Sequence, residues 1–177
     1  MNVEYIAEIG NNHKGDLSLA KEMADAAIEA NADYVKFQIY NIDKFISSTN
    51  PYYNDFITES LQFEAFVELK EYIEKKGGTF LATPFDEDSL EFLSELGMKT
   101  FKIASGDMNN FQLLAQATKK GECLFLSVGG ANLDEIDATA NFIKAKKIEL
   151  VILHCIINYP ARFSELNLNF IRTLINR

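Results

Sequence analysis

Two lysines lie inside apolar, strand-like runs of this sequence and have the clearest potential for chemistry. Lys36 stands in YVKFQ and Lys102 stands in TFKI, each between aromatic or aliphatic neighbours. A buried ammonium group is costly unless an anion neutralises it. The two lysines therefore predict an anionic ligand, or a set of carboxylates, held between them.

Three hydroxyl residues at the ends of other strand-like runs favour the anionic ligand. Thr83, Ser105 and Ser127 are each followed within two residues by proline or glycine. Such positions offer a hydroxyl and exposed backbone N–H groups, which suits a phosphate. The alternative is structural: the two lysines would form ion pairs with Glu8 and Asp107. Because the pattern repeats, we favour the anion site.

The first predicted loop of the chain follows a carboxylate and contains a histidine. Glu8 lies in an apolar run that breaks at Gly10 into two asparagines, His13 and Gly15. A carboxylate buried without partners costs several kcal/mol, so we expect a compensating partner near Glu8. His13 is expected to order the loop through a hydrogen bond, with direct ligand contact as the alternative.

Three residues near the C-terminal end are further candidates, and two of them admit two interpretations each. His154 and Cys155 are adjacent on a predicted strand, so their side chains point to opposite faces and cannot form a nucleophile–base pair. We expect Cys155 to pack on the outer face and His154 to face inward, against a ligand or a core hydrogen-bond partner. Tyr159, in NYP, belongs either to a turn or to the aromatic wall of a sugar site.

Six β-branched or aromatic runs alternate with amphipathic helical patterns. This alternation predicts repeated βα units and a parallel sheet. Asp16, and Asn132 with Glu135, are predicted helix caps, and Gly97 is a predicted helix stop. Residues 39–62 are predicted to form one extended loop, whose aromatic residues either contact a ligand or pack the loop down. The predicted strands are Tyr5–Ile9, Tyr34–Gln38, Thr79–Ala82, Thr100–Ile103, Cys123–Ser127 and Glu149–His154.

The alternation of side chains along the strands predicts the architecture. Lys36 and Gln38 share one strand face, and Glu8 shares a face with Ile6. Helices cover both faces of a doubly wound sheet, which leaves no place for central lysines. A βα barrel has an inner face, on which polar residues near the strand ends converge. We therefore predict an α/β fold of the (β/α)8 TIM-barrel type. Such a barrel needs eight strands and about 200–250 residues, so residues 1–177 are expected to be its N-terminal portion, truncated to about six βα units.

Bulk composition excludes several classes of function. The net charge of −9 argues against broad nucleic-acid or anionic-membrane surfaces. No run of about 18 apolar residues is present, and the N-terminus lacks a signal-peptide pattern. Cys123 and Cys155 form no CxxC, so we interpret them as reduced thiols of a cytoplasmic protein.

Six motifs follow one another along the chain: AEIGNNHKGD, DYVKFQ, FLATPFD, FKIASGDMNN, LFLSVGGANLDEI and LHCIINYP. In this order and spacing they resemble the sialic acid synthase family, which includes N-acetylneuraminate, legionaminate and pseudaminate synthases. The resemblance implies a βα barrel followed by an antifreeze-like domain, which would lie outside this chain. It also implies condensation of phosphoenolpyruvate with an N-acetylated hexose such as N-acetylmannosamine, a divalent cation (Mn²⁺ or Mg²⁺), and a homo-oligomer.

The resemblance also implies roles for individual residues. Lys36 and Lys102 would hold the phosphate and carboxylate of phosphoenolpyruvate. Glu8 would contact sugar hydroxyls or manage a proton near the reacting carbons, and Asp107 stands at the family's acidic position. The remaining implied substrate-binding residues are Gln38, Thr83, Ser105, Ser127, His154 and Tyr159.

Several departures from the family pattern limit what the resemblance implies. The histidine segments that resemble its metal ligands are not in this sequence, so no metal ligand is assigned. Ile157 stands where relatives place Asn or Ser, and SVGG replaces STGM. We therefore expect little or no synthase activity from the isolated chain. Two alternatives stay open: a catalytically dead remnant that acts as an assembly or binding module, and a Schiff-base aldolase that uses Lys102 or Lys36 as its nucleophile.

Overall fold

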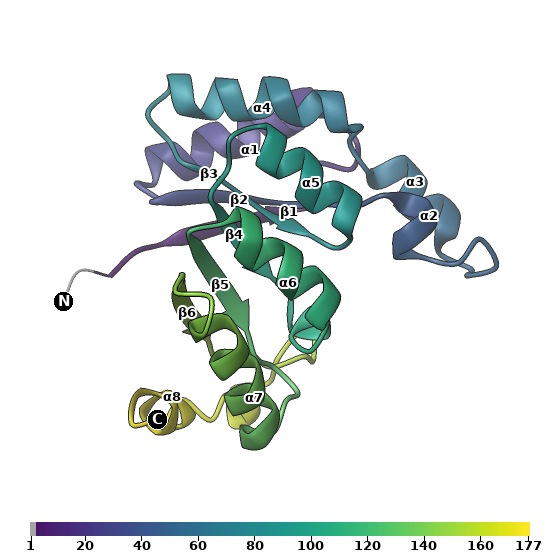
Figure 1. The fold of residues 1–177 in the computed structure, drawn as a ribbon. Helices are drawn as coiled ribbons and strands as arrows, with labels where there is room; N and C mark the ends of the chain where they lie inside the picture. Colours follow the sequence, from purple (N-terminus) through teal and green to yellow (C-terminus); the bar gives the residue numbers. More distant parts are fainter. Residues whose placement is uncertain (1–2) are drawn as a thin grey trace. The chain divides into compact units, whose positions relative to one another are not determined.

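The computed structural model describes residues 3–177, which form two compact units, the first ending at Gly97 and the second comprising Met98–Arg177. Each unit contains a three-stranded parallel sheet with helices between its strands (Figure 1). All six predicted strands are present, with ends that differ from the prediction by at most two residues. Among residues 3–177, no helix is long and apolar enough to span a bilayer.

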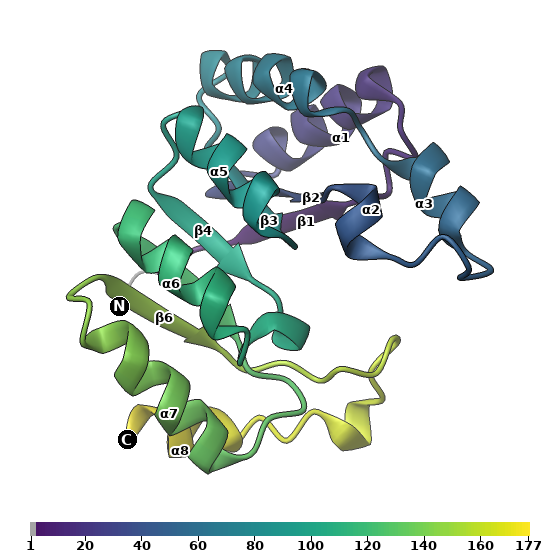
Figure 2. The same cartoon turned by 45° about the vertical axis from the view of Figure 1, so that its right-hand side comes forward.

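The first unit has the strand order β1–β2–β3. Helices α1 and α4 lie side by side over one face of this sheet, and α5 packs against β3 (Figures 1 and 2). Asp16 caps α1 by accepting hydrogen bonds from the backbone of Ser18 and Leu19, as predicted. The elements are β1 (Ile6–Gly10), α1 (Leu17–Glu29), β2 (Tyr34–Ile39), α2 (Ile42–Phe45), α3 (Tyr53–Glu59), α4 (Phe63–Lys75), β3 (Phe80–Pro84) and α5 (Glu87–Glu95).

The second unit has the strand order β4–β5–β6. Asn132 and Glu135 form the predicted capping box of α7. The elements are β4 (Thr100–Ile103), the 3₁₀ turn η1 (Ser105–Asp107), α6 (Phe111–Lys120), β5 (Cys123–Ser127), α7 (Leu133–Lys144), β6 (Glu149–Leu153), η2 (Phe163–Glu165) and α8 (Phe170–Ile175).

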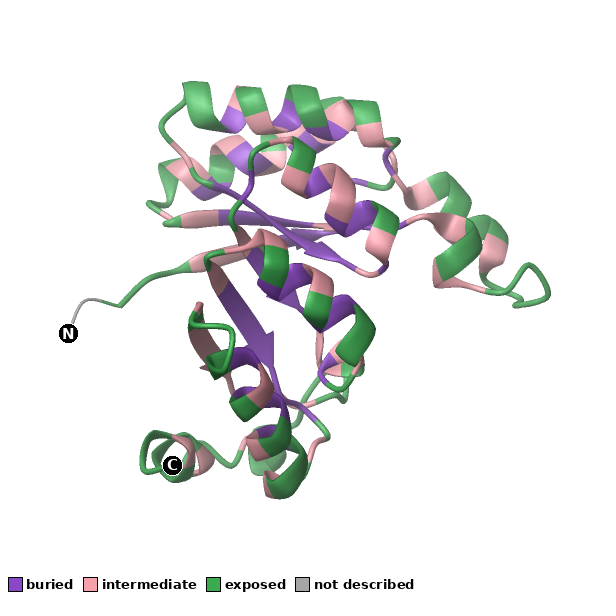
Figure 3. Ribbon diagram, in the orientation of Figure 1, coloured by how far each residue is buried: buried purple, intermediate pink, exposed green. Residues whose placement is uncertain are grey.

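Each sheet has one apolar, helix-covered face and one face that carries the polar residues. In the first unit, Val35, Phe37 and Ala82 are completely buried on the helix side, and Phe37 stacks on Phe80 at 5.8 Å. Figure 3 shows this burial continuing along the strands. Residues that pair in register on adjacent parallel strands point to the same face of the sheet. The register therefore places the polar side chains together on the face opposite the helices.

The prediction that residues 39–62 form one extended loop is wrong. Helices α2 and α3 lie within this segment, and neither helix contains a buried residue. The aromatic side chains Phe45 and Phe56 contact each other at 5.2 Å and also contact Tyr40. These contacts stabilise α2 and α3, which are both too short to be recognised from a periodic pattern of apolar residues.

Candidate functional site

The first unit brings Glu8, Lys36 and Thr83 together. The register pairs Glu8 of β1 with Lys36 of β2, and their side chains form an ion pair. The Lys36 ammonium also donates a hydrogen bond of 3.2 Å to the Thr83 hydroxyl of β3. Lys36 and Thr83 are 6% and 2% exposed, so the ammonium and the hydroxyl form a buried polar pair.

The partner expected near Glu8 is present, because Lys36 forms an ion pair with it, but Glu8 itself is not buried. Half of its side chain is exposed, so the expectation of a buried carboxylate is wrong. A β-bulge interrupts the register between Glu8 and Gly10, and the backbone of Gly10 has a φ of +58°. A Cβ at Gly10 would lie 3.3 Å from the Glu8 carboxylate and 3.8 Å from the Gln38 amide. Gln38 therefore lies beside Glu8, at the carboxyl end of the strands.

The loop after Glu8 is ordered by His13, as predicted. Gly15 donates its backbone N–H to Nδ1 of His13 at 3.1 Å, so the imidazole proton lies on Nε2. The ring is completely buried, and this burial lowers the pKa of His13. Neither Nε2 of His13 nor Oδ1 of Asn11 has a hydrogen-bond partner among the residues described.

The second unit repeats the lysine–hydroxyl arrangement. Lys36 pairs in register with Leu81, and Thr83 lies two residues further along β3. Lys102 pairs with Phe125, and Ser127 lies two residues further along β5. Lys102 and Ser127 are 8% and 5% exposed. In both sheets a buried lysine is thus followed, on the next strand and the same face, by a buried hydroxyl.

The Lys102 ammonium donates a hydrogen bond of 2.7 Å to the carbonyl of Ile103. Ser105 lies in η1, just beyond β4, and its Oγ accepts a hydrogen bond of 3.0 Å from the backbone N–H of Gly129. Asp107 ends η1 and accepts a weak hydrogen bond from the Asn110 amide at 3.3 Å. The hydroxyl of Ser105 therefore connects two loops at the carboxyl end of this sheet.

A cavity of about 220 Å³ lies beside Ser105 and the Gly129–Gly130 turn. Ile157 forms part of its wall and packs directly on this turn: a Cβ at Gly129 or Gly130 would lie 2.9 or 2.8 Å from the isoleucine side chain. The wall at this position is therefore apolar.

His154 and Cys155 have different environments, as expected for opposite faces, but the predicted assignment of outer and inner face is wrong. The thiol of Cys155 lies 3.2 Å from the Ser127 hydroxyl, and so belongs to the polar face of the sheet. Nε2 of His154 lies 2.7 Å from the carbonyl of Leu166, and the ring contacts Phe170 of α8 at 5.4 Å. Leu153 pairs in register with Ser127, so Cys155, two residues further on, shares the face of Ser127, and His154 takes the opposite face.

Tyr159 is 90% exposed. A set of three or more His, Cys, Asp or Glu residues that could hold a metal ion does not occur among residues 3–177. The described part of the chain therefore does not fit a resident divalent cation. The expectation that Lys36 and Lys102 share one cavity stays a prediction.

The fold and these residues define a parallel βα protein whose sheets carry buried lysine–hydroxyl pairs at their carboxyl ends. The NeuB family matches residues 23–177, and the chain belongs to this family. The family resemblance of the motifs is thereby confirmed.

Relatives and solved structures agree with this assignment. The chain is 39% identical to N,N'-diacetyllegionaminic acid synthase of Campylobacter jejuni, over 96% of the chain and 56% of that protein. It is 36% identical to human N-acetylneuraminate-9-phosphate synthase, over 94% of the chain and 50% of that protein. The crystal structure of N-acetylneuraminic acid synthetase from Leptospira borgpetersenii, in complex with citrate, matches with a TM-score of 0.96 and 39% identity, over 99% of this chain and 62% of that one.

The likeness confirms the α/β fold of the barrel type for the stretch that the chain covers. The chain spans about half the length of the curated relatives it matches.

Proposed function

We propose that this chain contributes the phosphoenolpyruvate-binding part of a sialic-acid-type synthase. The reaction would condense phosphoenolpyruvate with an N-acetylated hexose, such as N-acetylmannosamine, and release phosphate. Support comes from the family and from relatives that are synthases of sialic, legionaminic and pseudaminic acids.

One observation carries the proposal: a buried lysine followed by a buried hydroxyl on the next strand, in both sheets. A lysine supplies a positive charge and three donors, and a hydroxyl supplies one more donor. Together they can bind a phosphate or a carboxylate. Phosphoenolpyruvate carries both groups, so each lysine–hydroxyl pair is suited to bind one of them.

The other residues complete the proposed site. In the first unit, Glu8 is ion-paired with Lys36 and half exposed, so its carboxylate can accept hydrogen bonds from sugar hydroxyls or a proton near the reacting carbons. Gln38, beside it, can donate to the same sugar. In the second unit, Ser105 orients the Gly129 loop. A divalent cation would polarise the sugar aldehyde when bound, but the described residues do not fit one, and we derive no step through it.

Binding of phosphoenolpyruvate, measured by calorimetry, tests the proposal on the chain itself. We expect Lys36→Met and Lys102→Met each to weaken binding by roughly 10- to 100-fold, the range for losing hydrogen bonds to a charged group. Lys21→Met is the matched control, because Lys21 pairs with Glu68 on the helix surface and not on a sheet. Absence of binding, or equal affinity in all three variants, would refute the proposal.

The reaction is tested by phosphate release from phosphoenolpyruvate with N-acetylmannosamine and Mn²⁺. The assay is run on this chain and on any longer product of the same gene. Borohydride trapping with pyruvate separates the aldolase alternative, since only a Schiff-base enzyme forms a trapped imine on Lys36 or Lys102. Binding of phosphoenolpyruvate without release by either protein would support the binding-module alternative.

A further inference from the structure

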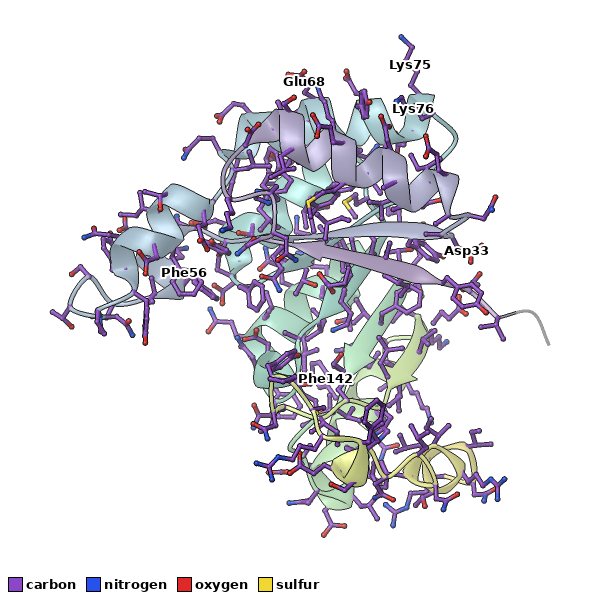
Figure 4. The ribbon with its side chains drawn as sticks, turned by 180° about the vertical axis from the view of Figure 1, so that it is seen from behind. Asp33, Phe56, Glu68, Lys75, Lys76 and Phe142 are labelled. Carbon is purple, nitrogen blue, oxygen red and sulfur yellow. The ribbon has the colours of Figure 1, made fainter. Side chains whose placement is uncertain are left out.

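The segment between β2 and α4 is joined to the loop after Glu8 through one side chain, Tyr40. Tyr40 is the first residue after β2 and is 6% exposed. Its ring stacks on Phe45 at 4.4 Å and meets Phe56 edge-on at 6.1 Å. Figures 1 and 2 show α2 and α3 beyond the carboxyl ends of the first sheet's strands, and Figure 4 labels Phe56 there.

The hydroxyl of Tyr40 bridges two segments that are far apart in the sequence. It accepts a hydrogen bond of 3.1 Å from the side-chain amide of Asn11, and it donates one of 3.3 Å to the carbonyl of Phe56 in α3. The ring alone would pack α2 and α3 onto the sheet. The hydroxyl adds a connection between α3 and the loop of residues 10–15, which follows Glu8.

A second contact brings the same two segments together without Tyr40. Gly15 lies so close to the backbone of α3 that a Cβ on it would be 2.4 Å from the carbonyl of Thr58. The loop also contains two buried polar atoms without a partner among the described residues, Oδ1 of Asn11 and Nε2 of His13.

We propose that Tyr40 is a positioning residue that couples α3 to the loop of residues 10–15, so that the two segments open and close together. The inference goes beyond the proposed reaction and does not depend on it. It assigns to the residues after β2 a mechanical connection to the carboxyl end of β1, where Glu8 lies.

Amide hydrogen exchange of the Tyr40→Phe variant tests this coupling. The variant keeps the ring and its aromatic contacts and loses only the hydroxyl. We expect exchange in both residues 53–59 and residues 11–15 to accelerate roughly five- to tenfold, the ratio for one lost net hydrogen bond. We also expect the carbonyl ¹³C resonance of Phe56 to move toward the value of a carbonyl without that bond.

Tyr53→Phe is the matched control. Its hydroxyl donates a hydrogen bond of 2.9 Å to Asp43, inside the same segment. We expect this variant to leave exchange in residues 11–15 and the Phe56 resonance unchanged. Acceleration in α3 alone, or in neither segment, in Tyr40→Phe would overturn the proposal.

A double mutant provides an independent test. Asn11→Ala removes the same connection from the loop side, so we expect it to accelerate exchange in α3. Combined with Tyr40→Phe, it should add nothing further in α3, because both changes break one bridge. Additive effects in the double mutant would show that the two residues act separately and would overturn the coupling.

Discussion

Replacing Gly15 by alanine should destabilise the first unit far more than the same change at Gly97. Both glycines have left-handed backbones, with φ of +76° and +80°. This conformation costs an alanine about 1–2 kcal/mol, and the stiffer unfolded chain returns about 0.4–1 kcal/mol. A Cβ at Gly97 meets no atom within 4 Å, so Gly97→Ala should cost about 1 kcal/mol in all.

At Gly15 a steric term is added. The new Cβ would lie 2.4 Å from the Thr58 carbonyl and 3.3 Å from that of Ser60, and neither is a flexible side chain. Overpacking of this kind costs about 1–3 kcal/mol, so we expect a total of about 2–4 kcal/mol. Urea unfolding followed by far-ultraviolet circular dichroism measures both variants. Equal free energies of unfolding for the two would refute the close approach of α3 to the loop.

Three further predictions concern titration. Burial lowers the pKa of His13, so the folded state binds the His13 proton less readily than the unfolded state does. The free energy of unfolding should therefore fall as the pH drops below 6.5. The urea midpoint of the His13→Asn variant should lack this part of the pH dependence. The hydrogen bond from Lys76 lowers the pKa of Asp25, so Lys76→Ala should raise it toward 3.8 in a carboxyl NMR titration. Burial and the charge of Glu59 raise the pKa of Tyr40 from 10.0 to about 12. The folded state therefore holds the Tyr40 proton more tightly than the unfolded state does, and the free energy of unfolding should fall as the pH rises from 10 to 12. Tyr40→Phe should remove one tyrosinate absorbance step near 12.

The strands were predictable because burial acts on every residue along them. A run such as YVKFQ must alternate between two faces, and the register of β1, β2 and β3 confirms that Glu8, Lys36 and Thr83 share one of them. Helix caps were predictable for a related reason. The Asp16 and Asn132 side chains satisfy backbone donors only a few residues away, so the signal is local.

Helices α2 and α3 could not be predicted in the same way. They have four and seven residues, which is too few for a periodic apolar pattern, and they contain no buried residue. Their order depends on Tyr40, a residue outside both helices. The available signal was an aromatic residue, Tyr40, directly after a strand. Its contacts with Asn11 and Phe56 are tertiary, and residue spacing does not reveal them.

The same distinction explains which candidate site residues the sequence placed correctly. Alternation correctly put His154 and Cys155 on opposite faces, but which face carries the polar residues depends on the pairing of β6 with β5. Leu153 pairs with Ser127, so Cys155 falls on the face of Ser127 and His154 on the other. The predicted environments were therefore exchanged: the thiol meets Ser127, and the imidazole meets the C-terminal segment.

The repeated offset of lysine and hydroxyl has a geometric reason that applies to each sheet separately. A parallel strand advances about 3.3 Å per residue, so a hydroxyl two residues beyond the lysine's partner lies about 6.6 Å further toward the carboxyl end. A lysine side chain is long enough to extend over that distance, and Lys36 does so when it donates to Thr83. A hydroxyl at the position that pairs with the lysine would lie beside the stem of the lysine side chain. A hydroxyl one residue further on would point to the helix-covered face. In the first sheet the ammonium of Lys36 and the hydroxyl of Thr83 thus meet near the carboxyl end of β3, one residue before that strand ends.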